Sequence, residues 1–118
     1  MLVPRVQPTV VGYNGHIYVM GGRNSNKVEL MSVEKYSPAT NTWSMVKEMK
    51  KKRWGGGGAV LHQRLVVVGG RGKRVGHTCE VFCEETNTWS PLEGATPATE
   101  RAYNACVVSK PWNWSYPT

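Results

Sequence analysis

The tetrapeptide Asn41-Thr42-Trp43-Ser44 occurs twice in the chain, the second time as Asn87-Thr88-Trp89-Ser90, 46 residues later. A longer segment also recurs, because Ile17-Tyr18-Val19-Met20-Gly21-Gly22 is matched by Leu65-Val66-Val67-Val68-Gly69-Gly70. Both pairs of segments keep the same order and nearly the same spacing. The chain therefore contains an internal repeat of about 48 residues.

Other positions follow the same period. An aromatic residue stands seven positions before each repeated tryptophan, and an arginine precedes each first apolar run. The aromatic residues are Tyr36 and Phe82, and the arginines are Arg5, Arg53 and Arg101. Because Arg101 leads into Ala105-Cys106-Val107-Val108, we expect a third unit to start there.

Each repeat is expected to form four short strands, because its runs are rich in Val, Ile, Tyr and Trp and are bounded by turn residues. In the first repeat these strands fall at Val10-Val11, 17–20, 28–36 and 42–46. Asn14-Gly15 predicts a tight hairpin between the first two strands. His62-Gln63 fills the same place in the second repeat without this turn chemistry and predicts a looser turn. Residues 47–53 show no apolar helical face and are predicted to form a connecting loop.

A four-stranded repeat near 50 residues is typical of a propeller blade, and this one resembles the kelch motif. The motif positions are Gly21, Gly22, Tyr36, Trp43, Gly69, Gly70, Phe82 and Trp89. The similarity covers residues 5 to 108 and is greatest to the BTB-kelch (kelch-like) family. We expect the glycines to end buried strands where backbones crowd, and the rings to lie between neighbouring sheets.

The predicted fold class is all-β, with kelch-type blades that are four-stranded antiparallel meanders in an incomplete propeller. Residues 1–48 and 49–96 form the first two repeats, 97–109 the first strand of a third, and 110–118 a divergent tail. Since propellers close with about four to eight blades, we expect a fragment of a longer protein or a ring completed by other copies. Exposed sheet faces and edges then predict self-association.

The composition excludes several classes of protein. The chain of 118 residues carries 15 Lys and Arg against 8 Asp and Glu, a net charge of +7, and 40% of its residues are hydrophobic. This apolar content is too high for a disordered chain, and no apolar run has the roughly 18 residues of a membrane helix. No signal peptide is evident at the start. An odd number of cysteines, 3, favours a reduced chain in the cytoplasm or the nucleus.

Arginines in two repeat registers are the predicted partner-binding residues. One register opens the first strand of a repeat, and the other follows a glycine pair. In kelch-like proteins both registers line the mouth of the ring, so the resemblance implies a site made of Arg23, Asn24, Arg53, Arg71 and Arg101. Guanidinium groups there suit a protein or acidic peptide partner. For Arg53 and Arg101 a structural role, with burial against backbone carbonyls, is the alternative, and Trp54 is either a stacking face or a cap on the rim.

Other chemistry finds little support. The basic runs 50–53 and 71–74 favour solvated loops over a nucleic-acid surface, and Gly55-Gly56-Gly57-Gly58 lacks the Lys-Ser or Lys-Thr of a phosphate loop. Cys79 and Cys83 would stand about 13 Å apart on a strand, too far for one zinc ion. They are predicted to be packing residues, with a redox-active Cys79 as the alternative. We expect no cofactor, no metal, no membrane contact and no catalytic residue.

The resemblance implies a protein-interaction module and not an enzyme. Kelch-like proteins present substrates to a cullin-type ubiquitin ligase, and this adaptor role is the leading expectation for a parent protein. Actin binding is the second hypothesis, and a propeller enzyme similar to galactose oxidase is the third.

Overall fold

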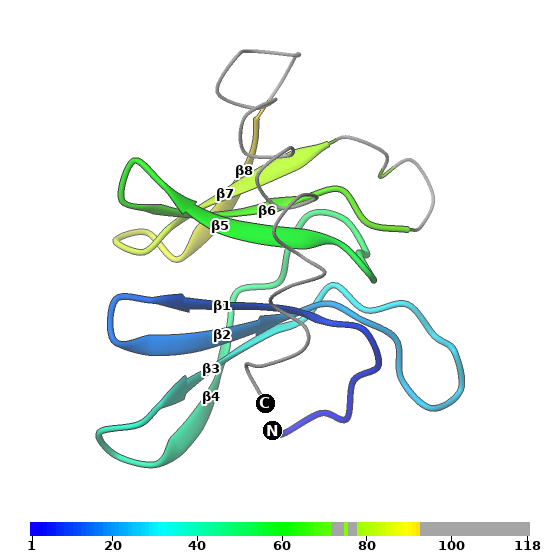
Figure 1. The fold of residues 1–118 in the computed structure, drawn as a ribbon, viewed down its shortest axis with the longest axis horizontal. Coiled ribbons are helices and arrows are strands. Elements are labelled where there is room, and N and C mark those ends of the chain that lie inside the picture. Colours follow the sequence, from blue (N-terminus) through cyan, green and yellow to red (C-terminus); the bar gives the residue numbers. More distant parts are fainter. Residues whose placement is uncertain (72–74, 76–77, 93–118) are drawn as a thin grey trace.

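The computed structural model describes residues 1–71, 75 and 78–92 of the chain. These residues form two four-stranded antiparallel sheets, each in simple sequence order. We call the first sheet blade 1 and the second blade 2, and Figure 1 shows the two lying one above the other. Blade 1 holds β1 (Thr9–Tyr13), β2 (His16–Met20), β3 (Val33–Ser37) and β4 (Thr42–Val46). Blade 2 holds β5 (Gly57–Leu61), β6 (Arg64–Val68), β7 (Cys79–Cys83) and β8 (Thr88–Leu92).

This architecture confirms the all-β prediction of kelch-type meanders in an incomplete propeller. Residues 47–53 form the predicted connection without a helix. The predicted boundaries between repeats remain predictions, and the third repeat and the tail lie outside the described residues.

The third strand begins later than predicted, at Val33 instead of Val28. The residues before it fold back as a loop, in which the Leu30 N–H donates to the Gly22 carbonyl over 2.8 Å. Arg23 and Glu29 form an isolated antiparallel bridge in the same loop. The backbone groups of this segment therefore bond within the loop and to the connection between the blades, where the N–H groups of Met49 and Arg53 donate to the carbonyls of Met31 and Leu30.

The hairpin of blade 2 is also tighter than predicted. Leu61 pairs with Arg64, so His62-Gln63 forms a two-residue turn like Asn14-Gly15 in blade 1. Its residues take φ values of 49° and 63°, as a type I′ turn requires. Pairing along the flanking strands imposes this turn even though the pair lacks the glycine that usually follows Asn or Asp in such turns.

The core lies between the two sheets. Blade 1 and its connection contribute Tyr18, Met20, Val33 and Met49, and blade 2 contributes Leu65, Val67, Phe82 and Trp89. The Tyr18 and Phe82 rings lie 6.0 Å apart between centroids, and the Trp89 indole donates to the Lys47 carbonyl over 2.7 Å. The prediction of rings between sheets is thus confirmed for Phe82 and Trp89.

For Tyr36 and Trp43 that expectation stays a prediction. Their rings contact each other with centroids 5.0 Å apart, but they lie on the face of blade 1 that points away from blade 2. Both remain half-buried, because the sheet on this side has no second sheet against it among the described residues.

Two glycines allow the blades to approach. A Cβ on Gly58 of β5 would lie 2.5 Å from Val11 Cγ2 and 2.7 Å from Thr9 Cγ2 of β1, so the glycine run brings the first strands of the two blades together. A Cβ on Gly21 would collide with the Arg53 carbonyl oxygen. Its φ of 67° is a second reason for glycine at this position.

Candidate partner-binding site

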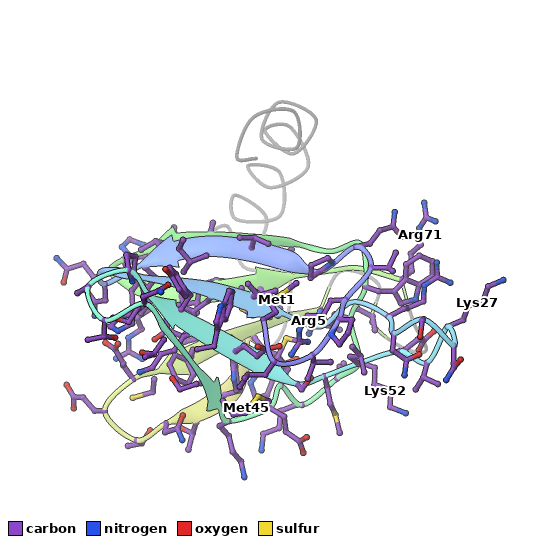
Figure 2. The ribbon with its side chains drawn as sticks, turned by 90° about the horizontal axis from the view of Figure 1, so that it is seen from below. Met1, Arg5, Lys27, Met45, Lys52 and Arg71 are labelled. Atoms are coloured by element: carbon purple, nitrogen blue, oxygen red, sulfur yellow. The ribbon has the colours of Figure 1, made fainter. Side chains whose placement is uncertain are left out.

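Arg23 and Arg71, the residues that directly follow the two glycine pairs, lie at one end of the molecule. Figure 2 shows Arg71 at this end together with Lys27 and Lys52. Backbone bridges place Arg23 against Val6 and Arg71 against Trp54, so the two arginines occupy equivalent positions in the two blades. Because each bridge joins a loop to the segment that leads into a first strand, the site is fixed on both sides by backbone hydrogen bonds.

The side chains of Arg23, Trp54 and Arg71 form one group, which we call the arginine–tryptophan cluster. The Arg23 Cζ atom lies 3.8 Å from the centroid of the Trp54 ring, and the Arg71 Cζ atom lies 5.2 Å from it. Both distances are within the range of cation–π attraction. The stacking role of Trp54 that the sequence left open is therefore the one observed, and the indole brings the cations of two blades together.

Charge within the cluster is only partly neutralised. The Trp54 Nε1 donates to Glu29 Oε2 over 3.2 Å, which is the one carboxylate contact recorded for the cluster among the described residues. Arg71 is exposed, and the half-buried Arg23 has a solvent-inaccessible Nε with no hydrogen-bond partner. The exposed Arg71 guanidinium can therefore bind an additional anion, whereas the Arg23 Nε is not accessible to one.

Asn24 shapes the loop next to this cluster. Its Oδ1 accepts from the backbone N–H groups of Asn26, over 2.9 Å, and Val28, over 3.0 Å. Such an Asx-type bond stabilises a turn locally. The side-chain oxygen of Asn24 is therefore occupied within its own loop. The role of Asn24 in this structure is to hold the backbone beside Arg23.

Arg53 lies in the interior and not at the mouth, which corrects its placement among the partner-binding residues. It is 2% exposed, and its Nη1 donates to the carbonyls of Gly69 and Thr78, each over 2.9 Å. Its Nη2 lies 3.0 Å from Glu80 Oε2. The structural alternative raised from the sequence is the one that applies, because a buried guanidinium needs this many acceptors.

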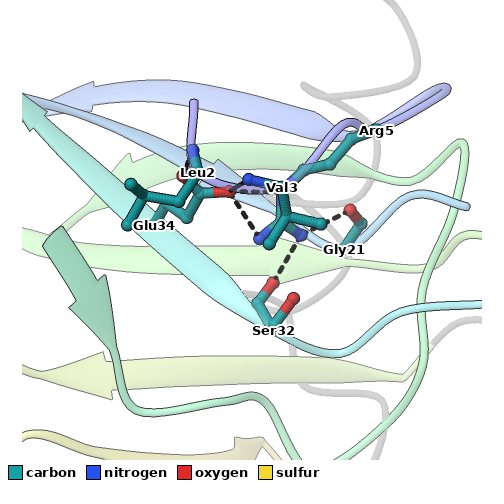
Figure 3. A network of polar contacts seen from close by, with 6 residues as sticks. All are labelled: Leu2, Val3, Arg5, Gly21, Ser32 and Glu34. Atoms are coloured by element: carbon teal, nitrogen blue, oxygen red, sulfur yellow. Dashed lines mark hydrogen bonds and ion pairs between the residues drawn. The ribbon is translucent and has the colours of Figure 1, made fainter. Parts of the chain in front are cut away.

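Blade 1 repeats this arrangement. Figure 3 shows Arg5 bound to Glu34 and to the carbonyls of Gly21 and Ser32. The carboxylate also accepts two backbone N–H groups, those of Leu2 and Val3, as Glu80 does from Lys50 and Lys51. The first arginine register is thus structural in both described blades. Arg101 shares the register but lies outside the described residues.

Sequence reasoning missed both carboxylates. Glu34 and Glu80 are 0% and 1% exposed, and they stand 46 residues apart, the same offset as the repeated tryptophans. A search for charged residues at that offset would have paired the two carboxylates with each other, alongside Arg5 and Arg53, which recur 48 residues apart. No such signal exists for Glu29, which has no counterpart in the repeat.

The two described thiols differ in environment. Burial raises the pKa of the Cys79 thiol above its usual value, although Arg53 opposes the effect. Hydrogen bonds from the Thr86 side chain and backbone lower the pKa of Cys83, which is half-exposed. Cys79 is thus the packing residue that was predicted, whereas Cys83, which was predicted to pack as well, is half-exposed and has the lower pKa of the two thiols.

Within the described ranges, no three His, Cys, Asp or Glu side chains gather where they could hold a metal ion. The same residues include no helix long and apolar enough to cross a membrane.

The kelch motif matches residues 4–50 and 55–94 of the chain, which correspond to the two observed blades. This chain therefore belongs to the kelch-repeat family, whose repeats act as protein-interaction modules.

Similar proteins carry the same repeat. The chain is 33% identical over 79 residues to an F-box/kelch-repeat protein of Arabidopsis thaliana, covering 64% of this chain and 21% of that protein. It is 34% identical over 82 residues to Kelch-like protein 26 of Danio rerio, covering 70% and 13%. With Kelch-like protein 26 of Mus musculus it shares 38% identity over 68 residues, covering 58% and 11%. The chain thus spans about a fifth or less of the length of these relatives.

Proposed function

We propose that this chain recognises an acidic segment of a partner protein through the arginine–tryptophan cluster, as part of a kelch adaptor for a cullin-type ubiquitin ligase in the cytoplasm or nucleus. The observation that carries the proposal is the position of Arg23 and Arg71 on one indole ring. Guanidinium groups bind carboxylates through paired, charge-assisted hydrogen bonds.

The electrostatics of the chain support an acidic partner. Its net charge is +7, and Arg71 lies at the same end as Lys27 and Lys52. A positive end of this kind accelerates the encounter with an acidic segment, and this electrostatic attraction weakens as salt is added. The cluster supplies positioned donors and no nucleophile or acid–base pair, so the proposal is for binding without catalysis.

The ligase role rests on the relatives and not on the geometry. One relative is named as an F-box/kelch-repeat protein and another as a kelch-like protein, and the family resemblance connects such proteins with substrate delivery. Grafting this chain in place of the kelch region of a BTB-kelch adaptor tests that role. Ubiquitin transfer to a substrate that carries the acidic segment would support the ligase role. Binding of that substrate without ubiquitin transfer would refute the ligase role and leave the proposed binding of an acidic segment in place.

Peptide binding tests the cluster itself. The probe is a fluorescein-labelled peptide of alternating Glu and Gly, and its Gln analogue is the uncharged control. Arg71→Ala is expected to weaken binding about tenfold or more, because a hydrogen bond to a charged group contributes about 1.5–3 kcal/mol.

Lys52→Ala is the matched control, since it removes one exposed positive charge from the same end of the molecule. It is expected to change the affinity about twofold or less. Equal losses for Arg71→Ala and Lys52→Ala would reduce the interaction to general charge attraction and refute the assigned site.

A further inference from the structure

Glu29 is the one acidic residue in the two segments that follow the glycine pairs. Its own segment, residues 23–32, also carries two cations, and residues 71–78 carry three cations and a histidine but no acid. The arginine–tryptophan cluster therefore draws one arginine from a segment with a carboxylate and the other from a segment without one.

Backbone pairing fixes Glu29 beside Arg23. The two residues form an isolated antiparallel bridge, and between them the Asn24 N–H donates to the Val28 carbonyl over 3.0 Å. Residues directly opposite each other in an antiparallel pair have Cβ atoms about 4.5–5.5 Å apart on the same face. The carboxylate of Glu29 and the guanidinium of Arg23 thus project from the same side of one tight loop.

The Glu29 carboxylate bonds to the indole and not to the neighbouring guanidinium. Its Oε2 accepts from Trp54 Nε1 over 3.2 Å, and the ion pairs recorded among the described residues are those of Arg5 and Arg53. Arg23 instead lies over the ring, with its Cζ atom 3.8 Å from the centroid. The negative charge of Glu29 is therefore fixed at the edge of the ring that both cluster arginines share.

This charge acts on any anion that Arg71 binds. Arg71 is exposed, and its Cζ atom lies 5.2 Å from the centroid of the Trp54 ring. Because Glu29 and Arg71 lie on one indole, an anion on Arg71 would stand at a distance comparable to the Debye length of about 8 Å at physiological ionic strength, so salt screens its repulsion by Glu29 only in part. The repulsion grows in proportion to the charge of the anion. It therefore opposes a phosphate group, with a charge of about −1.5 to −2 at pH 7, more than a carboxylate.

We propose that Glu29 is a specificity-determining residue, which adjusts the arginine–tryptophan cluster to carboxylate side chains and against phosphorylated ones. Without Glu29 the same arginines would favour the phosphate, since a guanidinium group binds phosphate as well as carboxylate through paired hydrogen bonds. This specificity rests on the proposed binding of an acidic segment, and it narrows the partner to segments that owe their charge to Asp and Glu.

Two peptides test this specificity. One is the fluorescein-labelled peptide of alternating Glu and Gly, and the other has phosphoserine in place of its central Glu. Their dissociation constants are measured by fluorescence polarisation at about pH 7.5, where phosphoserine is mostly doubly charged, for the parent chain and for Glu29→Gln. Glutamine keeps an oxygen that can accept from Trp54 Nε1 but carries no charge. The ratio of the two dissociation constants therefore isolates the effect of Glu29 on the extra charge of the phosphate.

Glu29→Gln is expected to shift this ratio about threefold in favour of the phosphoserine peptide at low salt. The shift should shrink as salt is added, because screening weakens the repulsion that the variant removes. Glu48→Gln is the matched control, since it removes one exposed carboxylate from the connection between the blades. It should leave the ratio unchanged.

The outcomes separate this specificity from the proposed function. An unchanged ratio in Glu29→Gln, with binding of the Glu peptide that still depends on Arg71, would overturn the specificity and leave the proposed function in place. An equal loss of affinity for both peptides would also overturn it, since Glu29 would then only support the indole. Binding of neither peptide, or binding that Arg71→Ala does not weaken, would refute the proposed function and the specificity with it.

Discussion

The buried ion pair of Arg53 and Glu80 is predicted to be a main source of stability for blade 2, and Glu80→Gln tests it directly. Glu80 is 1% exposed, and its Oε2 lies 3.0 Å from Arg53 Nη2. Its carboxylate also accepts the N–H groups of Lys50 and Lys51. Glutamine preserves the shape but leaves a buried guanidinium without its counter-charge, and it places an NH₂ donor among groups that are themselves donors.

The expected loss follows from this geometry. Breaking a buried pair by neutralising one partner costs about 3–5 kcal/mol. The free energy of unfolding of a domain is about 5–15 kcal/mol, so the variant loses a large part of its stability. With a urea dependence of about 1.5–2 kcal/mol per M, the midpoint of unfolding is expected to fall by about 2 M.

Urea titration followed by tryptophan fluorescence measures this shift. Glu48→Gln, at an exposed position on the same connection, is the matched control and should change stability by less than about 0.5 kcal/mol. If Glu80→Gln does not fold, Arg53→Lys supplies the graded value, because it keeps the charge but loses the planar donors. An unchanged midpoint in Glu80→Gln would refute the structural role of the ion pair.

Three further outcomes are expected. Replacing His62-Gln63 by Asn-Gly should raise the free energy of unfolding by about 1 kcal/mol, measured by urea titration, because both positions have positive φ; a loss of stability would contradict the type I′ assignment. Iodoacetamide should alkylate Cys83 faster than Cys79 in peptide mapping, with half-maximal rate below pH 9.0 for Cys83 and above it for Cys79, as their shifted pKa values require; equal rates would refute the difference. Trp89→Phe should cost about 1–2 kcal/mol in thermal or urea unfolding, since the Lys47 carbonyl loses its donor, and a neutral effect would show that this bond contributes nothing.

Repetition made most of the fold predictable. The 46-residue offset of Trp43 and Trp89 defines the blade, and the strands at 17–20 and 42–46 match the observed β2 and β4. The prediction failed where partner strands override local preference. His62-Gln63 adopts a tight turn without the usual Asn-Gly or Asp-Gly pair, because the register from Leu61 to Arg64 demands it. The start of β3 was misplaced because valine at 28 favours a strand, while the Asn24 side chain holds that segment in a loop.

The candidate site was predictable only in part. The register of Arg23 and Arg71 places both arginines at one end, but their meeting on Trp54 depends on a contact between blades that no spacing in the sequence encodes. The same limit applied to Arg53, since an arginine that binds a partner and one that binds Glu80 look alike in a repeat pattern.

The two arginine registers have different roles but are mechanically connected. The Arg53 carbonyl accepts from the Gly22 N–H over 2.7 Å, and Gly22 immediately precedes Arg23. Trp54 immediately follows Arg53, so the buried pair with Glu80 fixes the backbone on which the indole stands. In the proposed site Arg53 is therefore a positioning residue, which would act on partner binding through Arg23 and Trp54. Its loss should reduce affinity only together with stability, whereas loss of the exposed Arg71 should reduce affinity alone, and this separation distinguishes the scaffold of the site from its contacts.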